Sequence, residues 1–136
     1  MAQILLIEPD RVLAEIYGRS LVAAGNRVLS CFTAQAGIQA ADKQQPDLVI
    51  LELQLVEHSG IEFLYEFRSY PEWQATPVVI HTTVPPNEFS DNWQILRVEL
   101  GVETYLYKPQ TSLKQLIDTA QAQLSVPESV PSSVVA

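Results

Sequence analysis

The sequence is poor in cysteine and in basic residues, and each shortage excludes a class of protein. Its single cysteine, Cys31, cannot form an intramolecular disulfide. Only eight lysines and arginines face sixteen acidic residues, which gives a formal net charge of −8. A nucleic-acid surface needs a basic stripe, so we expect protein partners and no nucleic acid.

Long apolar runs are also missing. No stretch reaches the ~20 apolar residues that span a bilayer, and the amino terminus reads as a strand rather than as a signal segment. The sequence therefore predicts a cytoplasmic protein without a membrane contact. Its 136 residues, 47% of them hydrophobic, suit one core and leave no room for a second domain such as a DNA-binding module.

Five short apolar runs alternate with helix-like segments along the chain. Short links between such runs favour right-handed crossovers and a parallel sheet, so the pattern predicts an α/β fold, a doubly wound (βα)5 sheet. The runs cover residues 4–7, 28–32, 48–51, 78–81 and 105–107. The predicted domain covers residues 1–124, and residues 125–136 are predicted to be a disordered tail because they lack periodicity.

Helix signals differ in clarity along the chain. Asp10 and Gly25 are typical of the two ends of a first helix, and apolar residues spaced three and four apart predict a last helix over 113–124. Ile61, Leu64 and Tyr65 predict the buried stripe of the third helix. Pro85-Pro86 is expected to delay the fourth helix until about Asn87, with Ser90 or Asp91 capping a short helix that ends at Leu100.

Polar side chains follow four of these apolar runs. Because function gathers outside the carboxyl ends of parallel strands, we expect them to meet at one edge of the sheet. They are Glu8 and Asp10, Glu52, Thr82, and Lys108. A carboxylate at the end of a buried strand is desolvated unless a positive or hydrogen-bonding group faces it, so we predict that Glu52 pairs with Lys108.

In this order, the motifs resemble the response-regulator receiver domain, the phosphorylatable module of two-component signalling, over residues 2 to about 124. Glu8 matches the family's first acid, Thr82 its hydroxyl, Lys108-Pro109 its Lys-Pro, and Tyr105 its aromatic switch. The resemblance implies the strand order 2-1-3-4-5, shared by flavodoxin and the chemotaxis receiver.

Two departures from the family pattern concern the phosphorylation chemistry itself. Glu52 stands where the aspartyl nucleophile is expected, and its extra methylene places the carboxylate where the phosphoryl group should be. Pro9 stands where a second metal-binding acid is expected, which leaves only Glu8, Glu52 and the carbonyl of Gln54 as weak magnesium ligands. We therefore predict no cofactor, no enzymatic activity, and a pseudo-receiver acting as a phosphate-independent protein-interaction module.

Several interpretations remain open at this point. Glu52 either only forms a salt bridge with Lys108 or also accepts a hydrogen bond from Thr82 and so imitates phospho-aspartate. The alternative function is a working phosphoacceptor with a weakened magnesium site. A flavodoxin-like flavin carrier is less favoured, because Glu8-Pro9-Asp10 brings two negative charges and no N–H at Pro9 to the phosphate turn.

The resemblance places the interaction surface on the fourth helix, fifth strand and fifth helix. Its expected residues are Trp93, Arg97, Tyr105 and Tyr107, and its expected partners are a sensor kinase, a regulatory protein or a second copy of the chain. Trp93 is either an exposed anchor or a residue packed inward.

Overall fold

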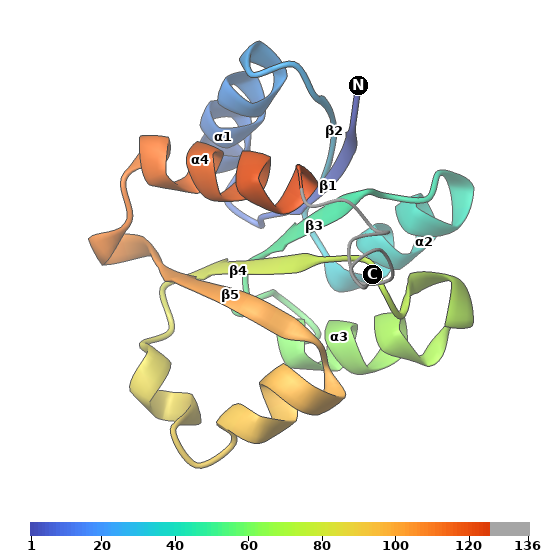
Figure 1. The fold of residues 1–136 in the computed structure, drawn as a ribbon, viewed down its shortest axis with the longest axis vertical. Helices are drawn as coiled ribbons and strands as arrows, with labels where there is room; N and C mark the ends of the chain where they lie inside the picture. Colours follow the sequence, from blue (N-terminus) through green and yellow to red (C-terminus); the bar gives the residue numbers. More distant parts are fainter. Residues whose placement is uncertain (126–136) are drawn as a thin grey trace, which may run out of the picture.

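Five parallel strands form the centre of the structure, a computed structural model that describes residues 1–125 (Figure 1). They are β1 (Gln3–Ile7), β2 (Arg27–Cys31), β3 (Leu48–Leu51), β4 (Val78–Thr82) and β5 (Val102–Tyr107). Their order is β2-β1-β3-β4-β5, and every pair is parallel. The predicted fold and strand order are confirmed. The predicted tail lies outside the described residues, apart from Ser125.

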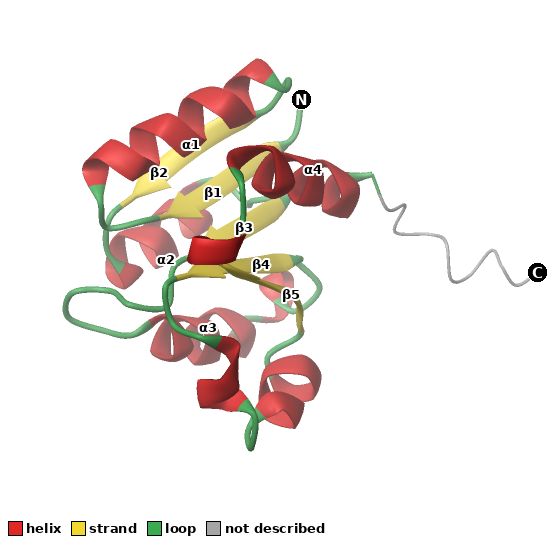
Figure 2. Cartoon of the chain, turned by 90° about the vertical axis from the view of Figure 1, so that its left-hand side faces the viewer, coloured by secondary structure: helices red, strands yellow, loops and turns green. Residues whose placement is uncertain are grey.

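Helices cover both faces of this sheet (Figures 1 and 2). Helices α1 (Arg11–Ala23) and α4 (Leu113–Leu124) lie on one face. Helices α2 (Ala34–Lys43) and α3 (Gly60–Ser69) lie on the other. Apolar residues of the middle strands point alternately to the two faces, which explains their nearly unbroken apolar sequence.

The larger core lies between the sheet and α2 and α3. Phe63, Phe67 and Trp73 form a stack there, with ring centroids 5.3 and 4.9 Å apart, and Trp73 belongs to the short 3-10 helix η1 (Pro71–Trp73). Helix α2 approaches β1 closely at Gly37, where an added Cβ would lie 2.6 Å from Ile7 Cδ1. A residue with a side chain at this position would force the Ile7 and Phe63 side chains to shift.

The buried stripe of α3 differs from the predicted one. Phe63, Leu64 and Phe67 are buried, whereas Tyr65 is half exposed. Two phenylalanines one turn apart remove more apolar area from water than Ile61 and Tyr65 would, so they take the core side of the helix.

Local signals explain the ends of the regular helices. The Asp10 carboxylate accepts hydrogen bonds from Val12 N–H and Leu13 N–H at the start of α1, and Gly25 follows its end with a φ of 102°. Ser112 and Gln115 form a capping box at the start of α4. The predicted bounds of these two helices hold to within one residue.

The fourth crossover, the segment 83–101 between β4 and β5, differs from its prediction. Pro85 is extended, as expected, but a 3-10 helix, η2 (Pro86–Phe89), begins at Pro86 itself, because the fixed φ of proline suits a first helical position. The next segment ends in a π-helix, η3 (Ile95–Glu99), without a side-chain cap. The predicted short helix that ends at Leu100 is therefore present, but neither Ser90 nor Asp91 caps it.

No helix within residues 1–125 combines the length and the apolar character that a membrane crossing requires.

Candidate functional site

Three strand ends bring a lysine and two carboxylates together at the carboxyl edge of the sheet. Glu8 follows β1, Glu52 follows β3 and Lys108 follows β5. Lys108 Nζ lies 2.7 Å from Glu8 Oε1 and 2.6 Å from Glu52 Oε1. Since β4 lies between β3 and β5, the lysine side chain reaches across the end of β4 to contact both acids.

Glu52 has more hydrogen-bond donors than this lysine alone. Its Oε2 accepts a hydrogen bond from Gln54 N–H at 3.0 Å and a short one from the Thr82 hydroxyl. Both Glu52 and Thr82 are buried. The predicted contacts of Glu52 with Lys108 and with Thr82 are thus present together.

Burial and hydrogen bonding act in opposite directions on this cluster. Burial alone would raise the pKa of Glu52, but the Gln54 amide, Lys108 and Thr82 outweigh it and leave that pKa below its ordinary value. Burial alone would lower the pKa of Lys108, but its hydrogen bonds to Glu52 and Glu8 raise it. Both residues therefore stay charged at neutral pH.

A chain of hydrogen bonds leads from Glu52 to the edge of the molecule. The Thr82 hydroxyl oxygen accepts from Val84 N–H at 3.1 Å, and the Val84 carbonyl accepts from the Tyr105 hydroxyl at 2.7 Å. Burial, with Glu52 and Glu88, raises the pKa of Tyr105 to about 12, so this hydroxyl remains a donor. The backbone of Val84 is held from both sides.

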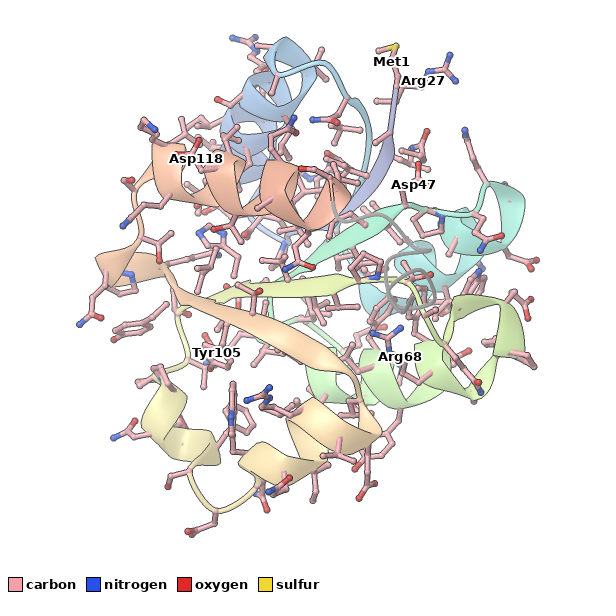
Figure 3. All side chains as sticks on the ribbon, in the orientation of Figure 1. Met1, Arg27, Asp47, Arg68, Tyr105 and Asp118 are labelled. Carbon is pink, nitrogen blue, oxygen red and sulfur yellow. The ribbon has the colours of Figure 1, made fainter. Side chains whose placement is uncertain are left out.

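The Tyr105 ring lies between the two aromatic residues of the fourth crossover. Its centroid is 6.1 Å from the ring of Phe89 and 6.1 Å from that of Trp93. Figure 3 shows Tyr105 on β5, facing the short helical segments. Sequence reasoning missed Phe89 and the Val84 backbone, because only the position of the fourth crossover reveals their contacts with Tyr105.

Not every predicted site residue joins the cluster. Asp10 is exposed, and its carboxylate caps α1 instead of facing Lys108; only its backbone N–H donates to Glu8 Oε2, at 3.1 Å. Its prediction as part of the acidic pocket is therefore wrong, because two amides of α1 engage the side chain. The Gln54 side chain accepts from Thr83.

The expected interaction residues differ in exposure. Trp93 is half-buried and packs against the larger core, whereas Arg97 is exposed. Tyr105 and Tyr107 are half-buried and line one groove of about 410 Å³ beside α4.

The residues at the edge do not fit a magnesium ion. All four carboxylate oxygens of Glu8 and Glu52 accept hydrogen bonds, and the Lys108 ammonium contacts both groups. Magnesium requires near-octahedral oxygen ligation and would have to displace this ammonium. Within residues 1–125, no three His, Cys, Asp or Glu side chains are grouped to hold a metal ion.

A second buried group lies beside the cluster. His81, on β4, makes an edge contact with Tyr17, with ring centroids 5.0 Å apart. Burial, with a smaller effect of Lys108, lowers the pKa of His81 to about 4. His81 is therefore a neutral core residue near pH 7.

Comparisons with known proteins identify the family of this chain. The response regulator receiver domain model matches residues 4–121. The KDP operon transcriptional regulatory protein KdpE of Escherichia coli is 33% identical over 109 residues, covering 80% of this chain and 45% of KdpE. The transcriptional regulatory protein YdfI of Bacillus subtilis is 29% identical over 128 residues, covering 91% of this chain and 55% of YdfI. The chain spans about half the length of these curated relatives.

Solved structures share the fold. The chemotaxis response regulator CheY4 of Vibrio cholerae superimposes with a TM-score of 0.79 at 22% identity, over 91% of this chain and 99% of CheY4. The non-phosphorylated HemR receiver domain of Leptospira biflexa gives 0.80 at 22% identity, over 94% of this chain and 98% of that domain. With a family match over residues 4–121 and this strand order, the chain belongs to the family of response regulator receiver domains, the signalling modules of two-component systems.

Proposed function

We propose that this receiver domain is a phosphate-independent protein-interaction module, in which Glu52 replaces the phosphate-accepting aspartate. The observation that carries the proposal is the position of the Glu52 carboxylate, which is bonded at once to the Thr82 hydroxyl and to the Lys108 ammonium. The hydroxyl and the lysine are the partners that the family resemblance assigns to the phosphorylated site. Glu52 engages both without a phosphate.

The hydrogen-bond chain supports a fixed readout of this state. Thr82, drawn toward Glu52, holds Val84, and Val84 holds the Tyr105 hydroxyl. The Tyr105 ring in turn packs against Phe89 and Trp93. The surface over β5 and the fourth crossover is therefore coupled to the Glu52 charge through contacts that need no modification.

The same contacts oppose phosphoryl transfer. Transfer to a carboxylate needs a free oxygen in line with the donor and a cation that neutralises the phosphoryl group. Here each Glu52 oxygen already accepts a hydrogen bond, and Pro9 supplies no acidic ligand.

Protein partners follow from this role. We expect a sensor kinase, a regulatory protein or a second copy of the chain to bind the surface of Trp93, Arg97, Tyr105 and Tyr107, in the cytoplasm. The curated relatives are named transcriptional regulatory proteins. The net charge of −8 over these 136 residues disfavours contact with a nucleic acid.

The direct test is intact-mass spectrometry after incubation with acetyl phosphate and magnesium. We expect no added phosphate on the wild type or on Glu52→Asp, because Pro9 still denies the metal a ligand. The double variant Pro9→Asp with Glu52→Asp is the positive control, since it restores both acids. Phosphate mapped to Glu52 in the wild type would overturn the proposal.

The second candidate is an ordinary phosphate-accepting response regulator, which the names of the relatives favour. It predicts a phosphate adduct in the same experiment. It also predicts that Glu52→Gln leaves the exchange of amide hydrogens over residues 84–99 unchanged without a phosphodonor. Our proposal predicts faster exchange there, because the amide weakens the bonds to Thr82 and Lys108.

A further inference from the structure

A groove of about 350 Å³ lies between α2 and α3, where the two helices pack side by side on the same face of the sheet (Figure 1). None of the residues that line it belongs to the Lys108 cluster or to the expected interaction surface. Its size is at the lower end of the range in which ligand pockets occur. The proposed function leaves this groove unassigned.

The floor and the walls of the groove differ in chemistry. Ala34 and Phe63 are buried and Ile38 is half-buried, and these three residues supply an apolar floor. Gln35 and Gln39 form the α2 wall and are exposed. The floor can therefore pack against the apolar part of a bound side chain, and the amide groups of the α2 wall can form hydrogen bonds with it.

The α3 wall is negatively charged. Glu62 and Glu66, one helical turn apart, both line the groove and are exposed. Like charges at this spacing repel one another. The Glu62 carboxylate accepts a hydrogen bond from Ser59 N–H and lies 3.8 Å from His58 Nδ1. The Glu66 carboxylate makes no ion pair within residues 1–125.

Basic side chains that could neutralise this wall are scarce. Between residues 54 and 96 the sequence has six acidic residues and one basic residue, Arg68. The Arg68 guanidinium donates to the backbone carbonyls of Trp73, Leu100 and Gly101. It therefore serves to join α3 to the segments before β4 and β5, and the acidic wall keeps its charge.

We propose that the α2–α3 groove binds a basic segment of a protein partner. A lysine or arginine side chain would lay its aliphatic part on Ile38 and Phe63, as such side chains do on apolar surfaces. Its charge would lie beside Glu62 and Glu66, where it relieves their repulsion. An arginine fits best, because its planar guanidinium can bind a carboxylate and Gln39 together.

The groove beside α4, lined by Tyr105 and Tyr107, serves as an internal contrast. Its walls carry tyrosine, threonine and glutamine, and its one acidic residue, Asp118, is paired with Lys114 at 2.6 Å. The grooves thus have similar volumes but different charge. A basic segment should select the groove between α2 and α3.

The test is a titration of the isotope-labelled full chain with a synthetic peptide, followed by NMR. The peptide alternates arginine and leucine, and a control peptide has glutamate in place of arginine. We expect the arginine peptide to shift the amides of α2 and α3 and the side-chain amides of Gln35 and Gln39. We expect the glutamate peptide to shift none of them.

Charge-reversal variants separate a specific groove from a general attraction to an acidic protein. Glu66→Lys should weaken binding at least about tenfold, and Gln39→Lys on the opposite wall should weaken it similarly. Glu72→Lys makes the same charge change as Glu66→Lys at an exposed residue that does not line the groove, and it should change affinity less than about twofold at equal ionic strength.

Three results would overturn the inference. They are equal losses from Glu66→Lys and Glu72→Lys, shifts centred on residues 86–99, and no shift with the arginine peptide. Because the Glu66 side chain has no ion pair to lose, Glu66→Lys should melt like the wild type, and circular dichroism checks this. The readout does not involve Glu52, so it is independent of the phosphorylation test.

Discussion

Two lysines of this protein form contacts of the same length in opposite surroundings. Lys108 Nζ lies 2.6 Å from Glu52, and Lys114 Nζ lies 2.6 Å from Asp118. The side chains of the first pair are 11% and 4% exposed, and those of the second pair 84% and 62%. The distance between the charged atoms therefore says little about what each pair contributes. The difference lies in what happens when one partner is removed.

The two pairs also have different origins in the sequence. Lys114 and Asp118 are one turn apart on α4, so helical periodicity alone brings them together. Lys108 is 56 residues from Glu52 and 100 from Glu8, so only the order of the strands can join them. Removing a pair within one helix leaves the arrangement of the strands unaffected. The Lys108 cluster, in contrast, joins the ends of three strands.

The largest expected effect is that of Lys108→Ala. Removing one partner of a buried pair costs about 3–5 kcal/mol, and here it leaves Glu8 and Glu52 facing one another without a cation. The free energy of unfolding from denaturant melts measures the loss. Lys108→Met keeps the aliphatic stem and separates the loss of charge from the loss of packing. A loss below ~1 kcal/mol would mean that the cluster is solvated.

An intermediate effect is expected from pH, because a buried imidazole lies beside this cluster. The pKa of His81 falls from 6.5 to about 4 on folding, so the unfolded chain binds the proton first as the pH drops. Its contribution to stability is complete above pH 6.5 and is lost toward pH 4, at about 1.4 kcal/mol per pH unit. Melts of His81→Gln between these values should lack that slope.

The carboxylate cluster beside His81 adds its own pH dependence in a lower range. Glu52, whose pKa is lowered in the fold, adds its own loss only as the pH falls below the ordinary value of 4.5. An unchanged slope in His81→Gln would mean that the protonated imidazole is accommodated in the core.

The smallest expected effect is that of Lys114→Ala. An exposed pair on a helix contributes very little to stability, and salt should reduce even this difference from the wild type. Unfolding at low and at high salt measures it. The Lys108→Ala loss should persist at high salt, because salt screens buried charges much less. If salt reduced the loss of unfolding free energy equally in Lys108→Ala and Lys114→Ala, the two pairs would not differ in how far they are shielded from solvent.

The sequence predicted correctly those parts of the fold and the site that depend on a single sequence pattern. Alternating apolar runs predicted the sheet, and the residues after each run predicted which side chains would meet at its edge. The Glu52 contacts followed because a buried carboxylate must be satisfied. Asp10 was misplaced because a residue that ends a strand and begins a helix can serve either, and the amides of α1 are nearer.

The positions of the helical segments in the fourth crossover could not be predicted from the sequence, for a physical reason. Its helical segments have no capping side chain, and their positions follow from the packing of Phe89 and Trp93 on Tyr105. Such contacts join residues whose spacing fits no helix or strand period. Likewise, the sequence placed Glu8 and Lys108 at the same edge of the sheet, but their direct contact was not predicted, because it depends on how far the lysine side chain reaches across the neighbouring strands.

The burial of the two tryptophans makes the protein its own optical probe. Trp73 is stacked inside the larger core, whereas Trp93 is half-buried against Tyr105. Indole emission shifts to longer wavelength as water reaches the ring, so the two residues report separately. In Trp73→Phe, the remaining fluorescence would come from Trp93 alone. Binding of any partner that covers β5 and the fourth crossover would then shift the emission wavelength of Trp93, so that no added label is needed.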